Sequence, residues 1–482
     1  MAIIVMKFGG TSVENADRIR RCAALVTDYA DDYKIVVVVS ALAKTTDQIL
    51  ECANAAARGD IETLRSRLEA LERRHQAVIS ELFPGGHDSE LRNRVLALLK
   101  QLRDFCDALL QLRSLTPQLL DVALPMGEKM SAQIFSAVLK ELGVRSMYVD
   151  SSEIVVTDDH FGDASADMDA TRARTRQRLL LDDCVPVVTG YCGSTPKGQP
   201  TTLGRGGSDI TGTILGAALG ADEVWIWTDV DGILTADPRT CPGARVLPEV
   251  TFAEAIELSY YGAKVIHRKA VRHAMESRIP LRIKNSLQPD LPGTKITATS
   301  MGGNGPIKAV TAMPNATLVT LRVRNELHVA AEIVGRLFLR LAHDRVDILF
   351  SMQSSAENSF GLVLRGEDTD RVIASIERVF RSELREGAVE SINVERDLGV
   401  VAVMGENLKR APDVVGRLFH AVSKSQATVI AVTHGASELS ICFAVPSRSV
   451  SEAVKAVHDE FFSDSDLPAM DLDNDALEGS IQ

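Results

Sequence analysis

The chain of 482 residues is too long for one compact core, and its length predicts two to four domains. Its composition, 45% hydrophobic and 24% charged, is that of an ordinary globular protein. The net charge of −12 argues against nucleic acid or an anionic membrane as a partner, so any phosphate substrate must be held by a few focused cations.

The cysteines and the apolar runs indicate a protein of the cytoplasm. The seven cysteines are scattered and lack metal-ligand spacing, which fits a reducing compartment and predicts neither a disulfide framework nor a metal site. The first ten residues, MAIIVMKFGG, have no basic region typical of a signal peptide. The longest apolar runs, such as 35–39, have the length of a strand, so we expect no membrane span.

Residues 1–300 alternate between short β-branched runs and longer helical patterns. Such alternation predicts βαβ units, and therefore an α/β fold with a mostly parallel central sheet covered by helices. The predicted buried strands are Ile3–Phe8, Ile35–Ser40, Val144–Val149, Val185–Gly190, Glu223–Trp227 and Leu281–Lys284.

A helical hairpin at about 60–114 interrupts this rhythm. Apolar residues recur there at spacings of three and four on both sides of a break at Phe83–Gly86. A narrow apolar seam of this kind fits either an arm that binds a partner or an insertion packed on its own domain. We favour the insertion, because such a seam is ordinary core.

The C-terminal third contains an internal repeat. The segment VGRLF at 334–338 recurs at 415–419, and the same offset of 81 relates 355–359 to 436–440. A constant register predicts two copies of one unit, each ordered strand, helix, strand, strand, helix, as in ferredoxin-like domains. The predicted domains are 1–300, 301–390 and 391–465, with a strand near 306–312 that the repeats could share, and an acidic, disordered tail at 466–482.

The segment KFGGTSV at 7–13 predicts an anion cradle. A buried strand ends in Lys7, Gly9 and Gly10 permit close backbone approach, and Thr11 with Glu14 forms a predicted capping box that opens a helix. The chain has no GxxxxGK[ST], so this is not a P-loop. Taken alone, the segment could equally be a strand-turn-helix corner with an exposed lysine.

A second glycine-rich loop, TTLGRGGSD at 201–209, precedes a helix of small residues at 210–220. Arg205 within it is the residue type suited to bidentate carboxylate recognition. The spacing of its glycines does not match the dinucleotide fingerprint. Two glycine loops that follow separate strands suit two ligands that meet head to head.

Two further segments lie where ligands bind in α/β proteins. TDVDG at 228–232 follows the strand that ends at Trp227, although a simple turn explains it equally well. YGAKVIH at 261–267 predicts Lys264 at a helix start and His267 one turn farther on. A lone histidine on a helical face favours a structural role over a catalytic one.

In this order and spacing, five motifs resemble the signature of the aspartate kinase family, within the amino-acid kinase superfamily. They span 4–268 and read KFGGTSV, GEKMSAQIF, TTLGRGGSD, TDVDGI with DPR, and YGAKVIH. The two C-terminal repeats are similar to the tandem ACT domains of that family. The resemblance implies an amino-acid kinase sandwich followed by two ferredoxin-like ACT domains, and a monofunctional enzyme without a fused homoserine dehydrogenase.

The resemblance also implies a role for each matching residue. Lys7, Asp209 and Lys264 would be catalytic, with Asp209 positioning the lysines. L-aspartate would be bound by Thr46, Glu128 at its ammonium, Arg205 at its α-carboxylate, and Ser208. The nucleotide would be bound by Lys7, Gly9, Gly10, Thr228, Asp229, Arg239, Lys264 and Val265. The position of Leu234 is often aromatic in relatives, which leaves open how tightly adenine is held.

The implied reaction transfers phosphate from ATP to the side-chain carboxylate of aspartate and gives 4-phospho-L-aspartate. The acceptor is already ionised, so no general base is needed, and lysines, glycines and nucleotide-bound Mg²⁺ suffice. The family further implies a homo-oligomer, dimer or tetramer, regulated by an end-product amino acid near Gln353, Ser354 and Glu357. The alternatives are a glutamate or acetylglutamate kinase, or a non-catalytic amino-acid sensor.

Overall fold

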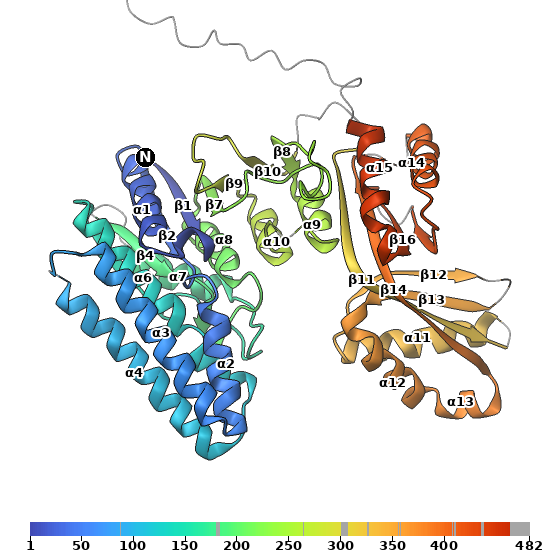
Figure 1. The fold of residues 1–482 in the computed structure, drawn as a ribbon, viewed down its shortest axis with the longest axis horizontal. Helices are drawn as coiled ribbons and strands as arrows, with labels where there is room; N and C mark the ends of the chain where they lie inside the picture. Colours follow the sequence, from blue (N-terminus) through green and yellow to red (C-terminus); the bar gives the residue numbers. More distant parts are fainter. Residues whose placement is uncertain are drawn as a thin grey trace, which may run out of the picture. The chain divides into compact units, whose positions relative to one another are not determined.

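The computed structural model describes residues 1–86, 88–179, 184–263, 265–299, 307–324, 327–354, 356, 358–406, 408, 411–434 and 438–462. The chain divides into two units (Figure 1). One unit comprises Met1–Leu234 with Val246–Met301, and the other comprises Thr235–Arg245 with Gly302–Gln482. The predicted tail 466–482 lies outside the described residues.

The first unit alternates strands and helices. Its strands are β1 (Ala2–Phe8), β2 (Tyr33–Val39), β3 (Ser146–Val149), β4 (Val185–Thr189), β5 (Cys192–Ser194), β6 (Pro200–Thr202), β7 (Glu223–Thr228), β8 (Glu249–Thr251), β9 (Leu281–Asn285) and β10 (Thr294–Thr297). Its α-helices are α1 (Ala16–Ala30), α2 (Thr45–Arg58), α3 (Ile61–Leu82), α4 (Ser89–Leu112), α5 (Pro117–Ala123), α6 (Met126–Glu141), α7 (Met168–Arg178), α8 (Gly207–Leu219), α9 (Phe252–Tyr260) and α10 (Arg268–Ser277).

The central sheet of this unit is mostly parallel, as predicted. Its strand order is β3-β4-β2-β1-β7-β9-β10-β8, and the first six strands run parallel to one another. All six predicted strands are present. The interiors of β1, β2, β4 and β7 are buried on both faces, which is why their sequences are continuous apolar runs instead of alternating ones.

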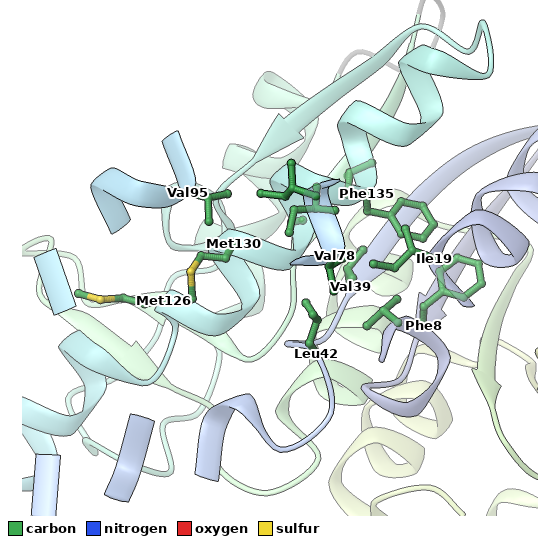
Figure 2. Packing of buried hydrophobic residues seen from close by; sticks show 14 of the residues in the cluster. Phe8, Ile19, Val39, Leu42, Val78, Val95, Met126, Met130 and Phe135 are labelled. Carbon is green, nitrogen blue, oxygen red and sulfur yellow. The ribbon is translucent and has the colours of Figure 1, made fainter. Parts of the chain in front are cut away.

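The predicted helical hairpin consists of α3 and α4, which lie side by side (Figure 1). Val78 of α3 and Val95 of α4 belong to the same buried cluster as Phe8 of β1 and Phe135 of α6, and Figure 2 shows these side chains together. The hairpin is therefore an insertion that packs on its own unit, as the apolar seam predicts.

The second unit is built around a sheet of six strands, in the order β12-β13-β11-β14-β16-β15. The strands are β11 (Ala309–Val323), β12 (Ile348–Ser354), β13 (Ser359–Arg365), β14 (Val389–Met404), β15 (Ala431–Thr433) and β16 (Ser440–Pro446). The α-helices are α11 (Leu327–His343), α12 (Thr369–Val379), α13 (Arg381–Glu386), α14 (Pro412–Lys424) and α15 (Val450–Phe462). The long strands β11 and β14 pair with each other and join the two halves into one sheet.

The repeat predicted from the sequence is confirmed, and it extends to individual interactions. The strand β13 recurs as β16 at the same offset of 81. The guanidinium of Arg336 lies 5.0 Å from the ring centre of Phe380, and that of Arg417 lies 4.6 Å from the ring centre of Phe461. Each arginine also donates a 3.0 Å hydrogen bond to the carbonyl of the residue before its aromatic partner. Both halves therefore contain the same arginine–phenylalanine contact at equivalent positions.

The segment Thr235–Arg245 belongs to the second unit, although the residues before and after it belong to the first. Ala236 and Cys241 are buried in a cluster that also contains Val401 and Phe443. The hydroxyl of Thr235 lies 3.0 Å from Nε2 of His458. This segment is thus a piece of the core of the second unit.

Candidate active site

The site begins with an ion pair between the two glycine-rich loops. Nζ of Lys7, near the end of β1, lies 2.5 Å from Oδ1 of Asp209 in the first turn of α8. Both side chains are almost fully buried. The close approach of α8 needs Gly212, because a Cβ there would lie 3.3 Å from Cβ of Lys7. The fold therefore holds one ammonium group at the carboxyl ends of the parallel strands, where α/β proteins bind ligands.

The first glycine loop is fixed from both sides. The N–H of Gly9 donates to the carbonyl of Trp227, and the carbonyl of Gly10 accepts from Ala43 in the loop after β2. A Cβ at Gly10 would lie 3.0 Å from the carbonyl oxygen of Ala41. These glycines permit three strand ends to converge on one point, as a phosphate cradle requires.

The predicted capping box at Thr11 and Glu14 is wrong. Residues Thr11–Val13 form a 3₁₀ turn, and α1 starts only at Ala16, with Asn15 as the N-cap that accepts from the N–H of Arg18. The turn uses the residues that would have capped the helix. The helix N-terminus therefore lies farther along the chain than the motif predicts.

Two glycines of the second loop adopt conformations that other residues rarely take. Gly204 and Gly206 have φ of +76° and +70°. A Cβ at Gly204 would lie 2.2 Å from a carboxylate oxygen of Asp163, and one at Gly206 would lie 2.3 Å from Cβ of His267. Only glycine tolerates both the positive φ and the lack of space for a Cβ. Backbone geometry therefore requires glycine at both positions.

Arg205 stands between these glycines and is exposed. Its guanidinium has no hydrogen-bond or ion-pair partner within the described part of the chain, which leaves all five of its N–H donors available. Ser208 is buried at the start of α8, where it lies against Gly190. A Cβ at Gly190 would lie 2.5 Å from Oγ of Ser208.

Glu128 supplies a buried acceptor at the start of α6. The residue is 4% exposed, and its Oε2 has no hydrogen-bond partner among the described residues. Burial raises the pKa of Glu128 to about 8, although hydrogen bonds from the backbone at Ala41 and Glu128 act in the opposite direction. The adjacent Lys129 is paired with Asp150 at 2.7 Å. A ligand ammonium group would therefore find a carboxylate oxygen with no competing cation bonded to it.

Thr46 lies half-buried in the first turn of α2. Its neighbour Thr45 is fully buried, and the Oγ1 of Thr45 has no partner in the described residues. A Cβ at Gly127 would lie 3.1 Å from Cγ2 of Thr45, so the first turns of α2 and α6 are packed together. Sequence reasoning named Thr46 and missed Thr45, because adjacent threonines in a motif do not reveal which one faces inward.

The residues predicted for the nucleotide follow β7. Oγ1 of Thr228 donates to Oδ1 of Asp229 at 3.2 Å, and Asp229 is exposed. Oδ1 of Asp231 accepts from the amide of Asn285 at 2.5 Å. Gly232 has a φ of +148°, and a Cβ there would lie 2.5 Å from Oγ1 of Thr294. The turn that continues β7 is thus held by the strands beside it.

The segment 261–267 differs in part from its prediction. Lys264 lies outside the described residues, and Val265 is half-buried. The helix α10 starts at Arg268, and the side chain of His267 caps it by accepting from the N–H of Lys269. His267 is therefore not one turn inside a helix, but its structural role is confirmed.

Leu234 and Arg239 lie where the chain passes from the first unit into the second. Arg239 belongs to Thr235–Arg245 in the second unit, where its exposed guanidinium bonds to Asp237 at 2.6 Å. Leu234 is half-buried and forms an isolated bridge with Val246.

Tyr191 is a strained residue that sequence reasoning missed. It follows β4 with a φ of +76°, which is costly for a residue with a side chain. Its N–H donates to Oγ1 of Thr211, and a Cβ at Gly207 would lie 2.4 Å from its ring. Strain of this kind concentrates at functional sites. The only sequence signal was an aromatic residue between two glycines, at 190 and 193.

The predicted effector residues lie in the second unit. Gln353 and Ser354 are exposed near the end of β12, where they pair with Phe360 and Ser359 of β13. Glu357 lies outside the described residues.

Within the described residues, no group of three or more histidine, cysteine, aspartate or glutamate side chains is placed to hold a metal ion. No described helix combines the length and the apolar character needed to cross a bilayer.

Comparison with known proteins identifies both parts of the chain. Residues 2–285 match the model of the amino acid kinase family, and residues 401–461 match an ACT domain model. Aspartokinase 1, chloroplastic, of Arabidopsis thaliana is 31% identical over 479 residues, which cover 96% of this chain and 81% of that protein.

Two solved structures of one relative are similar to the whole chain. The complex of E. coli aspartokinase III with aspartate and ADP, in the R-state, matches with a TM-score of 0.82 and 30% identity. The complex of the same enzyme with lysine and aspartate, in the T-state, matches with a TM-score of 0.76. Both alignments cover 95% of this chain and 99% of the solved one. This chain belongs to the aspartokinases of the amino acid kinase family.

Proposed function

We propose that the protein transfers the γ-phosphoryl group of ATP to the side-chain carboxylate of L-aspartate, giving 4-phospho-L-aspartate and ADP. The observation that carries this proposal is the buried Lys7–Asp209 pair, which lies between two glycine loops at the carboxyl ends of the parallel strands. The solved complex of E. coli aspartokinase III with aspartate and ADP supports the same substrates.

The substrate amino acid is held at both of its α groups. Arg205 binds the α-carboxylate with donors that no described residue uses, and Glu128 accepts from the ammonium group through its unpartnered Oε2. Thr46 and Ser208, each in the first turn of a helix, add hydroxyl groups. The side-chain carboxylate is then left free to face the nucleotide.

The reaction needs no base, because the attacking carboxylate oxygen is already ionised at neutral pH. This oxygen forms a bond to the γ-phosphorus while the bond from phosphorus to the β,γ-bridging oxygen breaks, and ADP leaves with the electron pair. Lys7 stabilises the charge on the transferring group, and Asp209 keeps the ammonium in place. Gly9 and Gly10, which carry no side chain, let the phosphates approach the backbone of this loop closely, and Thr228, Asp229, Arg239, Lys264 and Val265 complete the nucleotide side.

Mg²⁺ enters as part of the nucleotide. We expect phosphate oxygens and water to hold most of its coordination positions. When bound, it neutralises charge on the β- and γ-phosphates.

We further infer that an amino acid made downstream of aspartate binds the ACT repeats, near Gln353, Ser354 and Glu357, and lowers activity. The lysine complex of E. coli aspartokinase III supports this regulation. We expect the enzyme to be a homodimer or homotetramer. The seven scattered cysteines support a reducing compartment such as the cytoplasm as its location.

A coupled assay of ADP release tests the catalytic proposal. L-aspartate should give ADP, whereas L-glutamate and N-acetyl-L-glutamate should not. Release of ADP with glutamate alone would assign a different amino acid kinase, and no release with any of the three would favour a sensor without catalysis. Calorimetry with lysine, threonine and methionine tests the regulatory site, and absence of binding by all three contradicts it.

A further inference from the structure

A pocket of about 350 Å³ opens at the amino ends of the central strands β1, β2 and β7, whereas the candidate active site lies at their carboxyl ends. Its lining includes Ala2 and Ile4 of β1, Tyr33 at the start of β2, and Glu223 at the start of β7. The active-site loops follow the other ends of these same strands. The pocket is therefore a separate cavity, and the proposed reaction does not use it.

Lys284 of β9 lines this pocket and is 8% exposed. Its ammonium group lies 5.7 Å from the ring centre of Trp225 and 5.2 Å from that of Trp227. The ring faces attract the cation but offer no lone pair, and no described residue accepts a hydrogen bond from it or forms an ion pair with it. Desolvation by the surrounding side chains lowers the pKa of Lys284, although Nζ itself is not sealed from solvent.

The charge of Asp290 acts on Lys284 without an ion pair between them, and the two carboxylates that line the pocket are already engaged. Glu223 accepts from Nε1 of Trp225 at 2.7 Å and from the guanidinium of Arg282 at 3.1 and 3.2 Å. Asp222 accepts from the N–H of Ile3 at 2.7 Å. Both carboxylates thus have partners of their own, and neither forms an ion pair with Lys284, so the ammonium group keeps its donors for a group that enters the pocket.

The side chains that line the pocket favour a ligand whose anionic group is attached to a planar or apolar group. Trp225 packs edge-on against Tyr33, with 5.9 Å between ring centres, and Ile4 adds an aliphatic surface. Aromatic walls with a few charged groups are typical of small-molecule sites, and here the charges of Glu223 and Arg282 offset each other. We propose that this pocket binds a small organic anion, a carboxylate or phosphate ester on a planar or apolar group, with Lys284 as its counter-ion.

The two tryptophans of the chain, Trp225 and Trp227, both flank Lys284, so their fluorescence reports on this pocket. The whole protein is titrated with benzoate, phenyl phosphate and the neutral isostere benzamide, in saturating L-aspartate and ADP to occupy the active site. At least one anion should change the fluorescence saturably, and benzamide should not. If neither anion gives a saturable change, the proposal is overturned.

Two variants test whether the fluorescence change arises from binding at Lys284. Lys284→Met should abolish it, whereas Lys100→Met, which removes the same charge at an exposed position on α4, should leave it unchanged. A response that survives in Lys284→Met overturns the proposal. If Lys284→Met does not fold, a crystal of the wild-type protein soaked in 4-iodobenzoate decides: iodobenzoate in this pocket with its carboxylate against Lys284 supports the site, and its absence from the pocket overturns it.

Discussion

Lys7 and Asp209 are separated by 201 residues in the sequence, yet Nζ of the lysine lies 2.5 Å from Oδ1 of the aspartate. The contact joins the first strand of the sheet to the helix that follows the second glycine loop. Each residue is positioned by a different local structure, so the pair forms only when α8 packs against β1.

Replacement of Lys7 by alanine should lower kcat by about 10²- to 10³-fold, because a preorganised cation is lost from the phosphoryl group in transit. Steady-state ADP release measures this effect. Lys100→Ala, at an exposed position, is the matched control and should retain full turnover. Near-normal turnover in Lys7→Ala would remove the lysine from the mechanism.

Replacement of Arg205 by alanine should raise the KM for aspartate about 10- to 150-fold and change the KM for ATP much less. This range corresponds to the loss of a charge-assisted hydrogen bond of about 1.5–3 kcal/mol. Full kinetics with each substrate varied in turn provide the measurement. If the KM for ATP rises more than that for aspartate, Arg205 belongs to the nucleotide site.

Binding of aspartate should release protons near neutral pH. Burial raises the pKa of Glu128 to about 8, so the free protein holds this side chain mostly protonated at pH 7. The substrate ammonium favours the ionised form, and binding therefore expels the proton. Apparent affinity should rise with pH up to about 8, by at most about tenfold per unit, and then level off.

Calorimetry in buffers of different ionisation enthalpy counts the protons released at pH 7. The Glu128→Gln variant should bind aspartate weakly and without proton release. Binding by the wild-type protein with no buffer dependence would show that Glu128 is already ionised, or that it does not meet the ammonium group.

A fragment that ends at residue 301 should expose Cys241. In the whole chain this thiol is 2% exposed, within a cluster that includes Val401 and Phe443 of the second unit. The fragment lacks those partners, so Cys241 should react with a thiol reagent at the rate of an exposed cysteine. Cys52, which is fully buried in the first unit, is the internal control and should stay unreactive in both proteins. Protection of Cys241 in the fragment would contradict this packing.

Features that depend on local periodicity or on a repeat were predictable from the sequence. The six predicted strands of the first unit and the hairpin of α3 and α4 follow from apolar spacing, and the duplication follows from a sequence repeat at an offset of 81. The Arg336–Phe380 contact could have been inferred too, because Arg417 and Phe461 stand at the same offset. Both members of each pair are visible in the sequence.

Features set by tertiary packing were not predictable. Tyr191 takes a positive φ because its ring and N–H are fixed by Gly207 and Thr211, which lie farther along the chain. The start of α1 at Asn15 depends on a 3₁₀ turn that a capping motif does not reveal. Likewise, nothing in the composition of Thr235–Arg245 marks it as core of another unit.

Because Thr235–Arg245 belongs to the second unit, the ways in which the two units could be recombined during evolution are limited. A kinase and its sensor joined by one linker could be exchanged by recombination at a single junction. Here, a new sensor must also pack against Thr235–Arg245. A working chimaera therefore needs coordinated junctions near 234, 245 and 301. Kinase and sensor are therefore expected to be inherited together, as one evolutionary unit.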